Sequence, residues 1–292
     1  MTTAGGSSAL GELGWVHARQ VLPPALLLPV QNQLSAWLRR AGAPRRWPWQ
    51  GIDQQAIRLQ RRNPRALGAL AAALPQLEQV YVLALHAQLG ALLRAQSGWS
   101  QAVLSPIHNL RAKLPWRLSQ SAFTTVPWHQ DYGASDPQED PVCLLTAWIP
   151  LSPAGPRQGG LELIPRSHQL GWLPHERGPR GPEVRPEALA QALLQRPDLQ
   201  PVAIDAQPGD VVLFDQLTLH RSQPNRSRRC RWTLDLRYAE LGASSGRPGQ
   251  WARDPLVGEP VGPAVLELVR ERSAALTDPG RPVVKRVDLA VS

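Results

Sequence analysis

Residues 208–220, "PGDVVLFDQLTLH", contain the pattern that decides the fold class. The first three residues predict a tight turn, because proline and glycine supply the backbone angles that turns require. The apolar residues 211–214 then predict a buried strand, and a second strand runs into His220.

The same texture extends over much of the chain, from about residue 102 onward. Short apolar runs alternate with proline- and glycine-containing turns, as in "CLLTAWIPL" (143–151), "GLELIP" (160–165) and "RWTLDLRY" (231–238). Several short strands separated by such turns predict a β-sandwich or a β-barrel.

Helices are predicted mainly before this β-rich region. Residues 24–40 have apolar side chains at helical spacing and predict an amphipathic helix. Residues 41–63 are read as a polar loop and residues 64–97 as one or two helices rich in alanine and leucine. Residues 171–200 predict a loop with one short helical piece, "PEALAQALLQ".

The chain length is compatible with one domain, because all-β barrels and sandwiches reach this size as single units. We expect one domain over residues 1–292 of the 292-residue chain, in a mainly β fold with flanking helices. It would consist of a helical front (1–100), a β core (about 101–240) and a C-terminal appendage (241–292).

The composition argues against several broad classes. The formal charge of +9 is compatible with nucleic acid, but the arginines are scattered and not interleaved with aromatic residues. We find no apolar run of membrane-spanning length and no pattern typical of a secretory signal. The two cysteines, Cys143 and Cys230, do not suggest a disulfide framework, so a cytoplasmic location is expected. We expect a monomer or a homodimer.

A histidine and a carboxylate lie two residues apart in "WHQD" (128–131). On an extended backbone, His129 and Asp131 face the same side and could bind one cation together. With His220 they would form a set of two histidines and one carboxylate, which is diagnostic of non-haem Fe(II) oxygenases. The alternative is that the three residues are unrelated; other histidines, such as His175, are expected to be structural or exposed.

The run "RWTLDLRY" (231–238) has two unlike faces if it forms a strand. Its polar residues alternate with apolar ones, so they project to opposite sides. The apolar face must pack on other elements, possible partners being the helices at the front of the chain, and the polar face must look into a cavity or solvent. Arg231 on the polar face would suit a dicarboxylate, because its planar fork binds a carboxylate through two hydrogen bonds.

Several motifs occur together in the order and spacing of the phytanoyl-CoA dioxygenase-like family, which the chain resembles. The resemblance covers about residues 105–240 and, more weakly, the stretch "GWVHARQVLPPALL". The motifs are "WHQD", "CLLTAWIPL", "QGGLELIPRSH", "PGDVVLFDQLTLHRSQPNRS" and "RWTLDLRY". The resemblance implies a double-stranded β-helix, a jelly-roll or cupin-like core. It also implies Fe(II), 2-oxoglutarate and O2 as cofactor and co-substrates.

The resemblance also implies roles for particular residues. The iron ligands would be His129, Asp131 and His220. The residues that hold or surround 2-oxoglutarate would be Arg231, Ser222, Lys113, Thr146 and Trp148. Lys113 could equally be a surface lysine, and Trp148 could belong to the core.

The implied reaction is hydroxylation of a C–H bond in a small polar metabolite, with release of succinate and CO2. Halogenating members of the family carry a small residue in place of the carboxylate, so Asp131 favours oxygenation. Two other classes remain open: a metal-binding cupin-like isomerase or ligand-binding protein, and a nucleic-acid demethylase. Substrate contacts are expected from loops at 45–53, 132–140 and 172–183, since loops commonly carry specificity.

Overall fold

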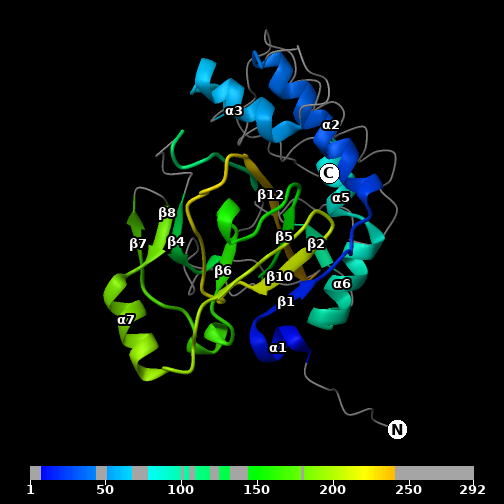
Figure 1. The fold of residues 1–292 in the computed structure, drawn as a ribbon. Helices are drawn as coiled ribbons and strands as arrows, with labels where there is room; N and C mark the ends of the chain where they lie inside the picture. Colours follow the sequence, from blue (N-terminus) through cyan, green and yellow to red (C-terminus); the bar gives the residue numbers. More distant parts are fainter. Residues whose placement is uncertain are drawn as a thin grey trace, which may run out of the picture.

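A computed structural model describes residues 8–43, 51–67, 78–99, 102–104, 109–118, 125–131, 144–178 and 181–240 (Figure 1). The expected C-terminal appendage at 241–292 lies outside the described residues, as do Cys143 and two of the three loops named above as candidates for substrate contacts, at 45–53 and 132–140, except for residues 51–53.

The larger of two main sheets has six strands that pair in antiparallel fashion. Its order is β1-β10-β5-β12, and β12 then pairs with both β2 and β3. The strands are β1 (Trp15–Ala18), β2 (Ala102–Leu104), β3 (Asn109–Lys113), β5 (Leu144–Pro150), β10 (Val211–Asp215) and β12 (Arg231–Glu240). The long strand β12 therefore pairs with β5 on one side and with both β2 and β3 on the other.

The smaller sheet has four antiparallel strands in the order β4-β11-β6-β9. They are β4 (Val126–His129), β6 (Leu161–Leu163), β9 (Val202–Ala203) and β11 (His220–Ser222). A separate hairpin consists of β7 (His175–Gly178) and β8 (Gly181–Val184). The two main sheets confirm the predicted double-stranded β-helix core.

Apolar side chains fill the space between the two sheets. Val212 and Phe214 of β10 belong to a buried cluster with Leu161 and Leu163 of β6. Val211 and Leu213, which alternate with them along β10, belong instead to the cluster shared with the helices. The strand is apolar on both faces because both faces are covered.

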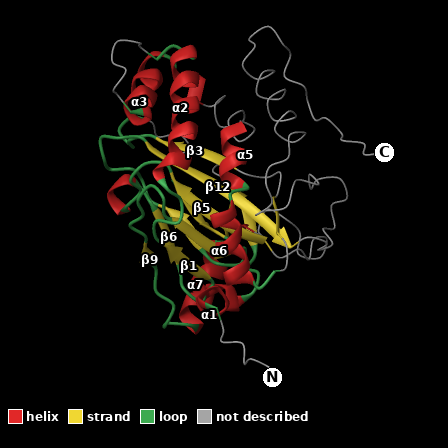
Figure 2. Cartoon of the chain, turned by 90° about the vertical axis from the view of Figure 1, so that its right-hand side faces the viewer, coloured by secondary structure: helices red, strands yellow, loops and turns green. Residues whose placement is uncertain are grey.

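The helices lie mostly on the outer side of the large sheet (Figure 2). They are α1 (Ala9–Leu13), α2 (Pro24–Arg40), α3 (Ile52–Arg62), α5 (Glu78–Ala84) and α6 (Ala87–Ser97), whereas α7 (Pro186–Gln195) lies beside the β7–β8 hairpin. Buried leucines of α2 and α5 share one core with Trp232, Leu234 and Leu236 of β12. The apolar face predicted for residues 231–238 therefore packs against helices, as expected.

Two local predictions differ from the structure. The stretch 41–63 was expected to be a polar loop, but α3 occupies residues 52–62. Its few apolar residues, among them Ile52, Ala56 and Leu59, recur at helical spacing and are buried. In the expected loop after residue 171, the β7–β8 hairpin precedes the predicted helix α7.

Across the part of the chain that the structure describes, every helix is too short or too polar to cross a membrane.

Candidate active site

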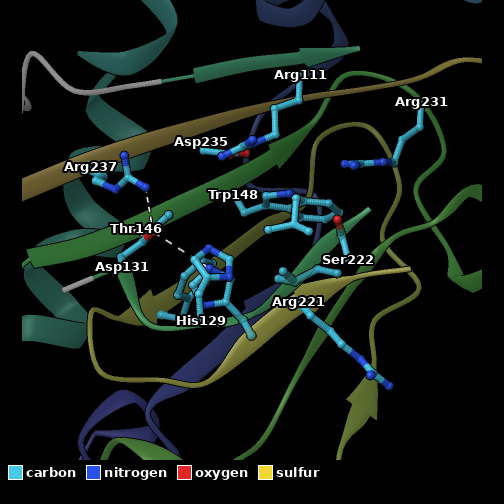
Figure 3. Close-up of a pocket in the computed structure, with 14 residues that line it drawn as sticks. Arg111, His129, Asp131, Thr146, Trp148, Arg221, Ser222, Arg231, Asp235 and Arg237 are labelled. Carbon is cyan, nitrogen blue, oxygen red and sulfur yellow. Dashed lines mark hydrogen bonds and ion pairs between the residues drawn. The ribbon is translucent and has the colours of Figure 1, made fainter. Parts of the chain in front are cut away.

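Three potential metal ligands converge where the small sheet faces the large one (Figure 3). His129 ends β4 and His220 begins β11, and the two are direct partners in the antiparallel pairing of these strands. Their ring centroids lie 4.0 Å apart. With Asp131, each residue offers a ligand atom, and these atoms all lie within 4.8 Å of one another.

Both imidazoles are oriented by the backbone. His129 Nδ1 lies 3.0 Å from the carbonyl of Pro127, and His220 Nδ1 lies 2.9 Å from the carbonyl of Thr218. Because a carbonyl can only accept a hydrogen bond, Nδ1 carries the proton in each ring and Nε2 keeps its lone pair. Burial lowers both pKa values, that of His129 to about 3, so the rings are neutral at pH 7 and able to bind a metal.

The carboxylate of Asp131 is held at both oxygens. Arg237 Nη2 donates to Oδ1 at 2.6 Å, and the Thr146 hydroxyl donates to Oδ2 at 2.5 Å. Burial is the largest influence and would raise the pKa of Asp131, but the charge and hydrogen bond of Arg237, together with the two neighbouring histidines, outweigh it and hold the pKa well below the usual range. Oδ1 also lies 3.9 Å from His220 Nε2, so an ionised oxygen faces the histidine pair.

Arg231 is a buried cation with few partners. Only 2% of its surface is exposed, and the one side-chain hydrogen bond that it forms with a described residue joins Nη1 to the hydroxyl of Thr233 at 2.9 Å. Its guanidinium carbon lies 5.6 Å from the ring centroid of Trp148. Among the described residues it forms no ion pair, its Nε has no hydrogen-bond partner, and burial lowers its pKa to about 10. A buried charge without a counterion is costly, so the site favours an anionic ligand here.

Lys113 is a buried neighbour of Arg231 and contacts Ser222. It is the pairing partner of Arg231 across β3 and β12. Its Nζ donates to the Ser222 hydroxyl at 2.6 Å and to the carbonyl of Gln223 at 2.7 Å. Burial, and next the charge of Arg231, lower the pKa of Lys113 to about 5, so the amine is neutral at pH 7.

A pocket joins these groups into one site. Of the eight residues expected at the site, seven line the pocket, and Lys113 lies behind Ser222 instead. The lining residues are Arg111, Val126, His129, Asp131, Thr146, Trp148, Leu161, Phe214, His220, Arg221, Ser222, Arg231, Asp235 and Arg237. Thr146 was expected on a strand that lines the co-substrate pocket; it lines the pocket here, and its hydroxyl donates to Asp131.

Seven pocket residues were given no site role in the sequence-based reasoning, and three of them form ion pairs within the pocket: Arg111, Asp235 and Arg237. Arg237 contacts Asp131, and the Nε of Arg111 forms an ion pair with Asp235. Arg237 and Asp235 belong to the polar face that was predicted for "RWTLDLRY", so part of the pattern was visible. Arg111 lies two residues before Lys113 on β3, and this spacing would have placed it on the same face.

Gln130, between two of the potential ligands, fixes their strand to neighbouring loops. Its amide donates to the carbonyls of Gly171 and Leu217, both at 2.8 Å, and accepts from the backbone of Leu173 at 2.8 Å. Its own backbone N–H donates to His175 Nε2 at 3.1 Å, which confirms a structural role for that histidine. These bonds were not foreseen, because the loops are distant in sequence.

Comparison with solved structures supports the fold. The epimerase SnoN from nogalamycin biosynthesis, in complex with Fe3+, alpha ketoglutarate and nogalamycin RO, is 19% identical with a TM-score of 0.57, over 96% of this chain and 91% of that chain. EctD from S. alaskensis with 2-oxoglutarate and 5-hydroxyectoine is 18% identical with a TM-score of 0.56, over 87% and 86%. The alpha ketoglutarate dependent carbocyclase SnoK is 20% identical with a TM-score of 0.52, over 97% and 98%.

No curated protein sequence matches the chain significantly. The family model described as phytanoyl-CoA dioxygenase (PhyH) matches residues 13–233, which include both main sheets up to the first part of β12 and all three potential metal ligands. The chain therefore belongs to the phytanoyl-CoA dioxygenase family.

Proposed function

We propose that this protein is an Fe(II)- and 2-oxoglutarate-dependent oxygenase in which His129, Asp131 and His220 bind the metal. The observation that carries the proposal is the convergence of these three side chains with their ligand atoms within 4.8 Å of one another. Two neutral imidazoles and one carboxylate are the donor set of non-haem Fe(II) oxygenases, and they leave coordination positions open for co-substrates.

The residues around the ligands fit this metal. The carbonyls that accept from both Nδ1 atoms keep Nε2 available, and Arg237 and Thr146 hold Asp131 in place as its charged form. Such outer partners orient metal ligands and tune their basicity. Gln130 keeps the segment between His129 and Asp131 fixed to the adjoining loops.

The pocket also fits 2-oxoglutarate. Arg231 is buried and has no carboxylate partner within the described part of the chain, so it would bind the distal carboxylate of the co-substrate. The Ser222 hydroxyl accepts from Lys113 and can therefore donate its own proton to the same carboxylate. Trp148 forms an apolar wall beside Arg231 and limits the access of water.

When bound, Fe(II) and 2-oxoglutarate supply the activation of O2, with formation of succinate and CO2. We propose that one oxygen atom is inserted into a C–H bond of a small-molecule substrate. Asp131 supports oxygenation over halogenation, because a carboxylate fills the position that a halide would need. The similar structures include an epimerase and a carbocyclase, so stereochemical inversion and ring closure are the alternative outcomes of the same site.

The other two classes considered above receive less support. A cupin-like isomerase has no need for a buried, unpaired arginine next to its metal, whereas Arg231 occupies that place here. The overall positive charge is the only feature considered above that supports a nucleic-acid demethylase. The single-domain organisation over 1–292 remains part of the proposal, and the family match over 13–233 supports it.

Anaerobic spectroscopy tests the proposal directly. Wild-type protein titrated with Fe(II) and then 2-oxoglutarate should develop a visible metal-to-ligand charge-transfer band, and Asp131→Ala should lose it. In labelled O2, a wild-type reaction with a true substrate should place one oxygen atom in succinate, and hydroxylation should label the product as well. An unchanged band in Asp131→Ala, or turnover without O2 and 2-oxoglutarate, would overturn the assignment.

A further inference from the structure

The guanidinium of Arg111 is bound to a carboxylate through Nε, whereas its two terminal amino groups have no partner among the described residues. It lies on β3, and its Nε forms an ion pair with the buried carboxylate of Asp235. Its side chain is 36% exposed and lines the pocket. Among the described residues, neither terminal amino group of Arg111 has a hydrogen-bond partner.

The position of Arg111 separates it from the co-substrate subsite. In the view of Figure 3, Arg111 and Asp235 lie above Trp148, and His129 lies below it. Arg231 begins the polar face of β12 and is buried, whereas the Arg111 guanidinium pairs with Asp235, four residues further along that face. An arginine held through Nε keeps its two terminal amino groups together as a fork, which matches the two oxygens of a carboxylate.

Charge balance indicates the same chemistry. Among the described residues at the pocket, four arginines and a bound divalent metal bring six positive charges. Two aspartates, the glutamate that pairs with one of the arginines and the dianionic co-substrate bring five negative charges. The side chains in this count are Arg111, Arg221, Arg231, Arg237, Asp131, Asp235 and Glu162. Lys113 adds no charge at neutral pH, because burial lowers its pKa to about 5.

We propose that Arg111 binds a carboxylate group of the primary substrate, with Asp235 as the positioning residue that aims its fork. The inference rests on the proposed function and specifies the substrate class: small molecules that carry an acidic group. Binding of that carboxylate would neutralise the remaining positive charge of the loaded site and would fix which C–H bond faces the metal.

The test compares acids with their neutral analogues. Holoprotein loaded anaerobically with Fe(II) and saturating 2-oxoglutarate is titrated with straight-chain carboxylates from butyrate to octanoate and with the corresponding primary amides. Binding is followed by the charge-transfer band and by thermal unfolding. The wild type should bind its best acid about tenfold or more tightly than the matching amide, because only the acid forms charge-assisted hydrogen bonds.

Arg111→Gln should abolish this preference while the charge-transfer band persists. The double variant Arg111→Gln/Asp235→Asn removes the buried, unpaired carboxylate as well, and it should behave in the same way if the single variant is unstable. Arg196→Gln, which breaks an exposed ion pair with Asp198, is the control with the same change of charge and should keep the preference.

Equal binding of acids and amides to the wild type would overturn the inference. So would an acid preference that survives in both Arg111 variants, or a wild type that binds none of the acids although its band is intact. Absence of the band in the wild type would instead refute the proposed function itself.

Discussion

Replacing Arg231 by methionine should have opposite effects on co-substrate binding and on stability. Arg231 is 2% exposed, forms no ion pair among the described residues and makes one hydrogen bond, to Thr233. Methionine has a similar length and no charge, so it can fill the space beside Trp148 without a counterion. The free protein should tolerate this change, whereas the complex with 2-oxoglutarate should not.

The magnitudes follow from the burial of the charge. The fall of the Arg231 pKa to about 10 corresponds to roughly 3 kcal/mol against the charged form, at about 1.4 kcal/mol per pK unit. Relief of this cost, offset by about 1 kcal/mol for the lost hydrogen bond, should leave the ligand-free variant as stable as the wild type or more stable. Loss of a buried carboxylate contact costs about 2–5 kcal/mol, which is a weakening of 2-oxoglutarate binding by about 30-fold or more.

Two measurements check this prediction. Anaerobic titration of the Fe(II) protein with 2-oxoglutarate gives the dissociation constant, and urea unfolding of the ligand-free protein gives the free energy of unfolding. Arg229→Met is the control, because Arg229 is an arginine of the same segment whose side chain is 71% exposed. The reasoning fails if both variants bind 2-oxoglutarate alike, or if Arg231→Met loses several kcal/mol of stability in the absence of ligand.

Three other outcomes are expected. Arg237→Gln should weaken Fe(II) binding by about tenfold in anaerobic calorimetry, because it removes the charged donor to Asp131; an unchanged affinity would show that this contact does not orient the ligand. Lys113→Met should raise the melting temperature over the metal-free wild type most near pH 5, and the gain should narrow as the pH rises toward 10. Between the folded pKa of about 5 and the ordinary lysine value near 10.4, only the unfolded wild type holds the proton, so wild-type stability rises with pH. A gain that does not vary with pH would contradict the low pKa. Gln130→Leu should lower the free energy of unfolding by about 2–4 kcal/mol in urea, since two carbonyls and one N–H lose their partner; a loss below about 1 kcal/mol would mean that water replaces the amide.

Local patterns in the sequence determined much of the architecture. The helix over residues 24–40, the buried strand at 211–214 and the two faces of "RWTLDLRY" were all predicted and are confirmed. Each rests on a spacing of apolar residues that is complete within one element. The spacing of two between His129 and Asp131 was interpreted on the same basis, as an extended backbone with both side chains on one side. In the structure β4 ends at His129, and Asp131 lies two residues beyond that end.

Only the tertiary structure decided how distant segments combine into a site. His220 reaches His129 through the register of β11 on β4, and Arg237 reaches Asp131 across the space between the two sheets. The ion pair of Arg111 with Asp235 depends in the same way on the pairing of β3 with β12. Strand order and register are set by the packing of the whole core, so a single segment does not encode them. The residue types of the potential metal ligands could therefore be predicted from the sequence, whereas the contacts that orient these ligands depend on the tertiary structure.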